Sequence, residues 1–293
     1  MNEASLVPAD PVVITTSEAD SDASLIKIWL HGRSQHTQRA YAADAASLRS
    51  WTGKSFVAMT LADLQAFADS LAELSAASRY RTLSAVKSLL AFGHRLGYLP
   101  FDVGGALRLP AVRGRLAERI LPEPAVHRML ELEPSPRNRA LLTLLYATGV
   151  RVSELCGLRW RDLQANAESA QITVFGKGGK TRAIRLPAAV WEQLTRLRSA
   201  GDDLDRPVFR SRKKSGGLTP VGALRIVRKA ALRAGIDLAV SPHWLRHAHA
   251  SHALDHGAPI HLVQATLGHA SVSTTGRYLH ARPADSSSRF LGF

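Results

Sequence analysis

The sequence has little cysteine and no long apolar segment. Cys156 is the single cysteine among 293 residues, which excludes an intramolecular disulfide framework and favours a reducing compartment. Its neighbours in SELCGL are apolar, so we expect a small buried core residue rather than a nucleophile. No apolar run approaches the roughly 20 residues that a membrane-spanning helix needs. The N-terminus also lacks the basic region and apolar core of a signal peptide. These absences predict a cytoplasmic protein with no membrane partner.

The chain also has fewer acidic than basic residues. The chain has 24 Asp and Glu against 38 Lys and Arg, which gives a formal net charge of +14. Five of the acids lie in the first 23 residues, which contain no Lys or Arg. Lys and Arg side chains that neutralise phosphates release condensed counterions, so this excess suits a polyanionic partner. A basic surface that only aids solubility is the alternative.

The first part of the chain reads as an acidic tail followed by helices and a basic linker. Residues 1–23 are rich in Ala, Ser, Asp and Thr and are predicted to be disordered. From 24 to 107 apolar residues recur at helical spacing, which predicts a small α-helical domain. Within it, Thr60 and Asp63 resemble a capping box. Residues 108–122, RLPAVRGRLAERILP, carry four arginines and two prolines, and this composition predicts an extended basic linker.

A second domain is predicted over 123–293. Apolar segments predict helices, and their ranges are about 137–148, 152–163, 188–200, 219–234, 243–256, 259–266 and 271–279. In QITVFGKGGKTRAIRL, residues 171–186, alternating apolar positions flank a Gly-Lys-Gly-Gly-Lys turn, which is a β-hairpin pattern. We therefore predict a mainly α-helical protein of two domains, the second being α+β with a small hairpin or sheet.

Tyr278, in LGHASVSTTGRYLH, is the residue with the greatest chemical consequence. A phenol is a weak nucleophile at neutral pH unless its proton is removed and the charge on its target is neutralised. Five cationic or proton-handling residues precede it in short, distinct contexts: Arg151, Lys177, His243, Arg246 and His269. Attack by a tyrosine on a phosphodiester requires such a set.

Several segments resemble the motif series of the tyrosine recombinases, the family of phage integrases and Xer-type recombinases. They are, in order, ATGVRVSELCGLRW, GKGGKTR, SPHWLRHAHASHAL and LGHASVSTTGRY. SQHTQRAYAAD and RTLSAVKSLLAFGHRLG are similar to that family's helical, SAM-like core-binding domain. The resemblance covers roughly residues 24–280. The chain departs from the family's usual wording at Ala248-His249 and at Phe101-Asp102-Val103, both outside the catalytic set.

The resemblance implies a site-specific recombinase or integrase that cuts and rejoins double-stranded DNA through a 3′-phosphotyrosyl intermediate. Tyr278 would attack the scissile phosphate. Arg151 and Arg246 would bind its non-bridging oxygens, because a guanidinium matches two oxygens at once. Arg151 could instead pair only with Glu154 on a helix surface, and both contacts could hold together.

The resemblance also implies the roles of the other three residues. His243 would accept the proton of the phenol and contact the phosphate, and His269 would donate a hydrogen bond to the same phosphate. Lys177, at the hairpin turn, would protonate the departing 5′ oxygen. Lys180 and Arg182 lie in the same turn and compete for that role, and a turn that only touches backbone phosphate is the alternative.

We expect no cofactor and no metal, because the covalent link stores the energy of the phosphodiester and Arg and His stabilise the charge. The pairs His243/His247 and His252/His256 have the i, i+4 spacing of zinc ligands, but neither has the Glu of an HExxH motif. The expected assembly is a homotetramer on DNA, formed from free monomers or dimers. The segment after Tyr278 would dock on a neighbouring protomer, or else pack locally.

Basic residues outside this set are expected to contact DNA phosphates, which fixes position without reading sequence. They are Arg39, Arg79, Arg81, Lys87, Arg210, Arg212, Lys213, Lys214, Arg225 and Arg228. Two other functions use the same features. A type IB topoisomerase-like nicking and closing enzyme shares the chemistry, and a DNA-binding protein could keep the fold without catalysis. The filled catalytic set argues against the second. Dimer resolution, phage integration and the mobility of a genetic element would all use the same residues.

Overall fold

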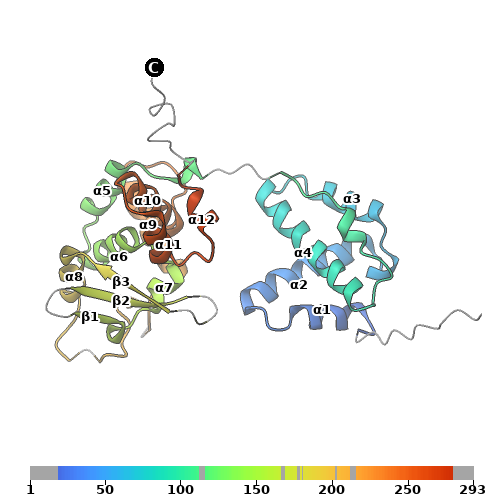
Figure 1. The fold of residues 1–293 in the computed structure, drawn as a ribbon, viewed down its shortest axis with the longest axis horizontal. Coiled ribbons are helices and arrows are strands. Elements are labelled where there is room, and N and C mark those ends of the chain that lie inside the picture. The colour runs from blue at the N-terminus through green and yellow to red at the C-terminus, as the bar shows by residue number, and fades with distance from the viewer. Residues whose placement is uncertain are drawn as a thin grey trace, which may run out of the picture. The chain divides into compact units, whose positions relative to one another are not determined.

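The chain folds into two compact units, Met1–Arg113 and Gly114–Phe293. The structure is a computed structural model, and it describes residues 19–111, 116–165, 169–176, 179, 181–201, 203–211 and 216–279. Figure 1 shows a first unit made of helices and a second unit in which helices surround a small sheet. The predicted mainly helical fold, with α+β structure in the second domain, is confirmed.

The described residues of the first unit form four α-helices whose starts are set by side-chain caps. They are α1 (Asp22–Leu30), α2 (Gln35–Thr52), α3 (Leu61–Ser70) and α4 (Ala76–Arg95). At each start, the hydroxyl oxygen of the residue before the helix accepts a hydrogen bond from a backbone N–H of the first turn. These capping residues are Ser21, Ser34, Thr60 and Ser75. The predicted capping box of Thr60 and Asp63 is present. Because Ser21 caps α1, the helical unit begins two residues before the predicted boundary at 24, while residues 1–18 of the predicted tail lie outside the described residues.

Two buried carboxylates tie the helices of the first unit together. Asp22 accepts hydrogen bonds from the Phe56 backbone N–H and from the Tyr98 hydroxyl, 2.8 Å away. Asp44 on α2 accepts two hydrogen bonds from the guanidinium of Arg81 on α4. The guanidinium of Arg81 thus joins two helices of its own unit, and its side chain is half exposed, so the predicted contact with DNA stays a prediction.

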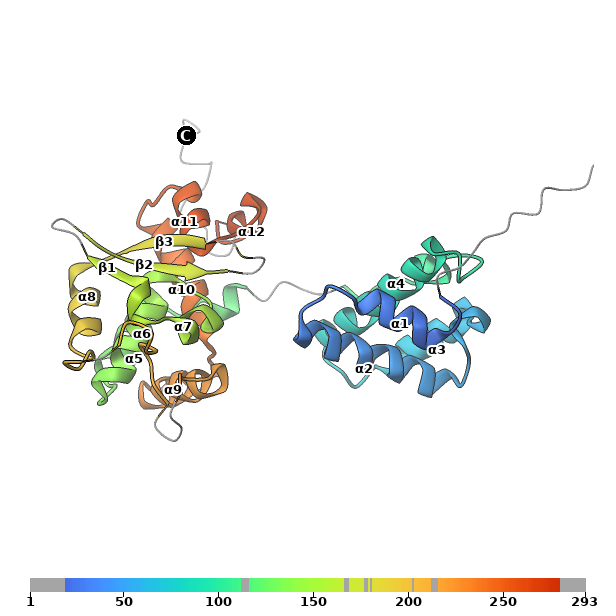
Figure 2. The same cartoon turned by 90° about the horizontal axis from the view of Figure 1, so that it is seen from below.

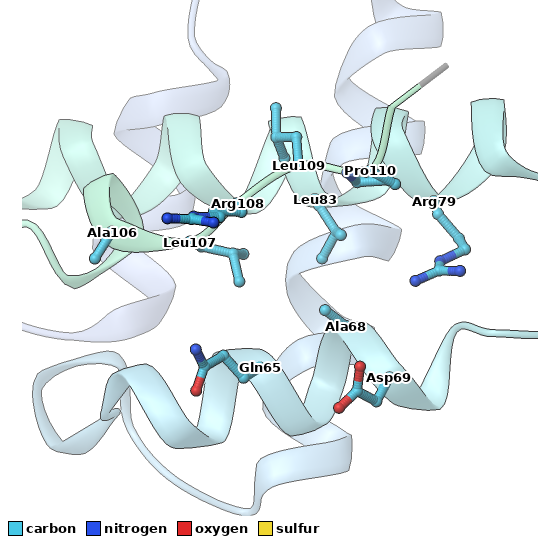
Figure 3. A pocket seen from close by; sticks show the side chains of 10 residues that line it. All are labelled: Gln65, Ala68, Asp69, Arg79, Leu83, Ala106, Leu107, Arg108, Leu109 and Pro110. Atoms are coloured by element: carbon cyan, nitrogen blue, oxygen red, sulfur yellow. The ribbon is translucent and has the colours of Figure 1, made fainter. Parts of the chain in front are cut away.

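A hollow of about 380 Å³ lies in the first unit where the chain leaves its last helical turn (Figure 3). Its residues come from α3, from α4 and from the segment that follows the 3-10 turn η2 (Val103–Ala106). Lys87 holds this segment by donating to the carbonyls of Gly105 and Leu107. Lys87 was also a predicted DNA contact, and its ammonium here stabilises the end of the unit.

The second unit contains eight helices and three strands in the part of the chain that is described. The helices are α5 (Glu123–Glu131), α6 (Pro136–Thr148), α7 (Val152–Gly157), α8 (Ala188–Thr195), α9 (Pro220–Arg233), α10 (Pro242–Asp255), α11 (Ile260–Leu267) and α12 (Val272–Gly276). The strands are β1 (Leu163–Ala165), β2 (Ala170–Phe175) and β3 (Thr181–Leu186). Figure 2 shows the sheet edge-on, with α11 beside β3.

The sheet is antiparallel in the order β1-β2-β3. The predicted hairpin is present as β2 and β3, in a register that pairs Phe175 with Thr181. The predicted helix over 152–163 is wrong in its second half. It ends at Gly157, because the Val208 N–H donates to the Leu158 carbonyl and the Trp160 N–H donates to the Arg206 carbonyl. These pairings with 206–208 replace the helical hydrogen bonds and lead into β1.

The core of the second unit lies between the sheet and α6, which is buried on several sides. Leu141, Leu144 and Leu145 of α6 are fully buried and pack in one cluster with Ile172 of β2. Cys156 packs half-buried against this cluster, and burial raises the pKa of its thiol to about 11, so the thiol stays protonated at neutral pH. None of the described helices has the length and apolar character that crossing a membrane demands.

Candidate active site

Helix α10 carries three polar residues of the candidate site on one face. His243, Arg246 and His247 stand at i, i+3 and i+4, a spacing that brings side chains together on a helix. This helix packs against α6 and α11, and α12 follows α11 after a short turn (Figure 1). The ends of three helices therefore meet at the polar face of α10.

Arg246 is buried, with only 3% of its surface exposed, and it joins two helix C-termini. Its guanidinium donates to the carbonyl of Gly149, which ends α6, at 2.5 Å, and to the carbonyl of Leu267, which ends α11, at 2.7 Å. Such terminal carbonyls have no partner within their own helix. Burial, with help from nearby Arg151, lowers the pKa of Arg246 to about 10, so the side chain remains a cation at neutral pH.

Gly149 provides the turn that lets these groups approach. It has a positive φ of 60°, and a Cβ at this position would lie 2.6 Å from the Leu267 side chain and 2.8 Å from the His249 ring. No other residue type fits there without displacing its neighbours. The glycine thus brings the end of α6 against α11 and leads directly into Arg151.

Glu154 holds two arginines at the start of α7. Its carboxylate accepts hydrogen bonds from Arg151 at 2.9 Å and from both terminal nitrogens of Arg182 at 2.8 and 3.0 Å. Burial alone would raise the pKa of Glu154, but the hydrogen bonds from Arg182 and Arg151 outweigh it and lower the pKa to about 2. Arg182 also donates to the Thr266 carbonyl at 2.7 Å, which connects strand β3 to the end of α11.

His269 follows directly after the carbonyls that the arginines bind. Arg246 donates to the carbonyl of Leu267 and Arg151 approaches that of Gly268 at 3.4 Å. The Nδ1 atom of His269 lies 2.9 Å from the hydroxyl of Thr275, which is fully buried. Burial, followed by the nearby arginines, lowers the pKa of His269 to about 4, so its ring is neutral at pH 7.

Tyr278 lies just after α12 with its ring buried. It packs with Ile120, Ala250, Val263 and Leu267, and 6% of its surface is exposed. Its ring is parallel to that of His269, with centroids 6.5 Å apart. Burial raises the pKa of Tyr278, and the nearby arginines, Arg246 before Arg277, act in the opposite direction. The nucleophile predicted from the sequence therefore sits beside two other members of the predicted set.

The hydrogen bond of the Tyr278 hydroxyl is made with His247, whose Nδ1 atom lies 2.8 Å away. His243, one turn earlier on α10, is exposed and faces His247 with ring centroids 5.5 Å apart. Burial, with the charge of Arg246, lowers the pKa of His243. The structure thus brings together Arg151, Arg246, His269, Tyr278 and, at the outer edge, His243.

Lys177 lies outside the described residues, as do Lys180 and the C-terminal segment 280–293. The strands that flank Lys177 are described, and the pairing of Phe175 with Thr181 leaves it in the short connection between β2 and β3. Arg182, which competes with Lys177 in the sequence, is 14% exposed and bound to Glu154. Its position indicates a structural link rather than a group free to enter DNA.

Sequence reasoning missed the place of His247 in this site and the role of Arg182 as a partner of Glu154. For His247, the available signal was its position four residues after His243, which we interpreted only as a possible zinc pair. For Arg182, the signal was the alternation of strand β3. It places Arg182 on the same face as buried Ile184 but does not reveal its partner. Both contacts join segments far apart in the sequence, so neither is visible in local pattern.

The histidine pairs considered as zinc ligands have other partners. His247 contacts Tyr278, while His252 Nδ1 lies 2.9 Å from the Tyr146 hydroxyl and His256 lies 3.4 Å from Glu123. Over the described residues, no three His, Cys, Asp or Glu side chains are grouped closely enough to hold a metal ion. His247, His252 and His256 therefore pair with two tyrosines and one carboxylate.

Several predicted DNA contacts are exposed cations on the surface of their own unit. Arg39 is exposed on α2, and Arg225 and Arg228 are exposed on α9. Arg79 lines the hollow of the first unit, at the end near Asp69 (Figure 3). Arg212, Lys213 and Lys214 lie outside the described residues. Exposure of this kind suits phosphate contacts that position a duplex.

Known families match both units of the chain. The phage integrase family matches residues 120–285, and the phage integrase N-terminal SAM-like domain matches residues 26–97. The tyrosine recombinase XerC of Xanthomonas campestris pv. campestris (strain B100) is 35% identical over 290 residues, which cover 93% of this chain and 88% of the relative.

Two solved structures share the fold. The XerH site-specific recombinase bound to its difH substrate, a pre-cleavage complex, has a TM-score of 0.69 at 22% identity and covers 89% of this chain and 82% of the other. A lambda integrase tetramer bound to a Holliday junction has a TM-score of 0.73 at 20% identity and covers 90% of this chain and 77% of the other. With the family matches and the XerC relative, the chain belongs to the phage integrase family and is a tyrosine-type site-specific DNA recombinase.

Proposed function

We propose that Tyr278 is the nucleophile with which this recombinase cuts DNA, and that Arg151, Arg246 and His269 bind the phosphate it attacks. One observation carries the proposal. The two guanidiniums are anchored on consecutive carbonyls, those of Gly268 and Leu267, and the next residue is His269, whose ring lies parallel to Tyr278. Anchored cations beside a buried phenol are suited to a target that gains negative charge during attack.

The arginines would act on the non-bridging oxygens of the phosphate. Arg246 keeps its charge at neutral pH although it is buried, and its hydrogen bonds to carbonyls do not neutralise that charge. Arg151 shares Glu154 with Arg182, so the carboxylate orients it while a positive excess remains. Two fixed guanidiniums then stabilise the transition state without reorganising at the moment of reaction.

His269 would donate one hydrogen bond to the same phosphate. In a neutral imidazole one nitrogen accepts and the other donates. If the Thr275 hydroxyl donates to Nδ1, the proton of His269 is on Nε2, the nitrogen away from Thr275. Thr275 would therefore fix the tautomer that His269 needs as a donor.

The proposed cleavage forms one bond to phosphorus and breaks another, and it needs no cofactor. The Tyr278 oxygen forms a bond to phosphorus, the bond from phosphorus to the 5′ oxygen breaks, and a 3′-phosphotyrosyl link remains. The 5′ oxygen needs a proton, which we assign to Lys177 from its place in the hairpin connection and from the family resemblance. The 5′ hydroxyl can later attack the link, which rejoins the strand with no ATP.

We also infer that the chain acts on double-stranded DNA as a homotetramer, and that it works in the cytoplasm. The lambda integrase of the same fold was solved as a tetramer on a Holliday junction, and exposed cations on α2 and α9 support contact with a duplex. Docking of the segment after Tyr278 on a neighbouring protomer remains a prediction. The topoisomerase alternative gains no support from the recombinases that match the chain.

The test is to trap the covalent adduct. The protein is mixed with fragmented genomic DNA of the organism that encodes it, stopped with SDS, and precipitated with potassium, which recovers protein-linked DNA. Sequencing the recovered ends identifies the site, from which a nicked duplex is built. The wild-type chain should form a metal-independent adduct, and Tyr278→Phe should bind the duplex but form none. An adduct formed by Tyr278→Phe would contradict the proposal.

A further inference from the structure

The hydroxyl of Tyr278 has a hydrogen-bond partner that the predicted catalytic set does not contain. His247 Nδ1 lies 2.8 Å from the phenol oxygen, and the two rings are tilted by 46° with centroids 5.7 Å apart. His247 is half-buried on α10, next in sequence to Arg246. Ala250, three residues further along the same helix, packs against the tyrosine ring. One face of α10 thus holds both the ring and the oxygen of the nucleophile.

The state of His247 suits an acceptor. Burial first, then the charges of His243, Arg119, Arg246 and Arg277, lowers its pKa to about 4. The ring is therefore neutral at pH 7. With its proton on Nε2, its Nδ1 lone pair is free to accept from the phenol.

Three arginines and the ring of His243 act on the pKa of His247. Arg246 and His243 come from α10, Arg119 from the 3-10 turn η3 (Ala117–Arg119), and Arg277 from the end of α12. These charges oppose protonation of His247 in the protein alone, so its ring stays neutral and can accept a proton. A bound phosphate adds a negative charge nearby, which favours the protonated form of His247.

We propose that His247 is a further catalytic residue, whose Nδ1 takes the proton of the Tyr278 phenol as the oxygen attacks phosphorus. The inference rests on the proposed role of Tyr278 as nucleophile. The bond from oxygen to hydrogen breaks as the bond from nitrogen to hydrogen forms, and the tyrosine oxygen uses its electron pair to bind phosphorus. When the 5′ hydroxyl attacks the link, His247 returns the proton to the departing tyrosine.

His243 then has a different task from the one that resemblance gives it. It is exposed at the start of α10, and in the described residues the hydrogen-bond partner of the phenol is His247, one turn further along the helix. An exposed ring beside Arg246 is placed to contact the phosphate itself. The two histidines thus divide proton acceptance and phosphate binding between adjacent turns of one helix.

The test compares two replacements of His247 in the full chain on the nicked duplex, in single turnover with saturating protein. His247→Asn places an amide near the position of Nδ1, where it can hydrogen bond to the phenol but cannot take its proton. His247→Gln places the amide near Nε2. We expect both to slow adduct formation about 100-fold or more, the usual size of a general-base contribution. His261→Asn, an exposed histidine on α11, is the matched control and should stay within about twofold.

A second substrate separates proton acceptance from protonation of the leaving group. In a duplex with a 5′-bridging sulfur at the scissile phosphate, the thiolate departs without a proton. Lys177→Ala should recover on this duplex, whereas His247→Asn should remain slow. Recovery of His247→Asn on the sulfur duplex would overturn the inference, and so would a rate within threefold of wild type on the ordinary duplex.

Folding and the proposed function are checked in the same series. Thermal melting and duplex binding of His247→Asn should match the wild-type chain. If the variant unfolds, His247→Ala with added imidazole replaces it, and a rate that does not rise with imidazole contradicts the inference. Absence of a Tyr278-dependent adduct in the wild-type chain would instead refute the proposed nucleophile, so the two failures are distinguishable.

Discussion

Buried carboxylates in the first unit and at the candidate site of the second unit have different numbers of arginine partners. In the first unit, buried Asp22 lies 3.3 Å from Arg49 and buried Asp44 binds Arg81, so each carboxylate meets one guanidinium. In the second unit, one carboxylate, Glu154, binds both Arg151 and Arg182. Charges matched one to one connect helices, whereas an excess of fixed cations prepares a place for an anion.

Half-buried Tyr98 and buried Tyr278 show the same contrast. Tyr98 donates to the carboxylate of Asp22, and burial together with this acceptor raises its pKa to about 12. Tyr278 donates to a neutral imidazole, and the charges of Arg246 and Arg277 oppose the effect of burial on its pKa. An anionic acceptor holds the phenol proton in place, while neighbouring cations favour its removal. The surroundings, and not the residue type, distinguish Tyr278, the proposed nucleophile, from Tyr98.

Replacing Arg246 in the second unit and Arg81 in the first should break the comparison most strongly. Arg246→Lys loses a planar group that reaches two carbonyls, so we expect adduct formation to fall about 100- to 1,000-fold, as when one fixed donor to a transition state is lost. Arg81→Lys, which disturbs the pair with Asp44, should lower the melting temperature of the first unit without slowing the chemical step at saturating protein. Single-turnover rates and melting curves measure both, and equal losses of rate would contradict the contrast.

Replacing the carboxylates should give a smaller, sharper difference. Glu154→Gln leaves Arg151 and Arg182 without their shared anion, so we expect adduct formation to fall about 10- to 100-fold, together with a loss of about 3 kcal/mol in unfolding free energy. Asp44→Asn in the first unit should destabilise as well, since it removes the anion that Arg81 binds. Its adduct rate at saturating duplex should change by less than threefold. A normal rate in Glu154→Gln would show that Glu154 does not orient Arg151.

Acid should weaken the second unit before the first. Burial is the main cause that lowers the pKa of His247, His249 and His269 to about 4, against about 6.5 in an unfolded chain. Between these values the unfolded state binds more protons, so the stability of the second unit is full above pH 6.5 and falls as the pH drops toward 4. Calorimetry of the full chain at pH 7.5 and 5 should show the transition sensitive to Glu154→Gln move to lower temperature. An unchanged transition would contradict the neutral state of these histidines.

Local pattern predicted those elements whose signals lie within a few residues. The alternation around Gly176 gave the hairpin, and Thr60 with Asp63 gave the start of α3. It failed for β1, because three residues are too few to show alternation and the chain near Trp160 is shaped by pairing with Arg206. Those pairings depend on segments brought together only by the fold.

The candidate site shows the same limit. The motifs identified Arg151, Arg246, His269 and Tyr278 as a group, and the structure adds how they are held. The contact of His247 with Tyr278 spans 31 positions, and Arg246 reaches Gly149 across 97. A sequence shows which side chains are available for chemistry, but their hydrogen-bond partners follow from helix ends meeting in space.

The most direct test of the account is to identify the residue that becomes linked to DNA. The trapped adduct is digested with nuclease and trypsin, and the modified peptide is sequenced by mass spectrometry. Because trypsin cleaves after Arg277 but not at the Arg282–Pro283 bond, the peptide that ends at Arg289, YLHARPADSSSR, should carry the nucleotide, linked through the tyrosine oxygen to a 3′ phosphate. A nucleotide on any other peptide, or a link to a 5′ phosphate, would contradict the assignment of Tyr278 and of the cations around it.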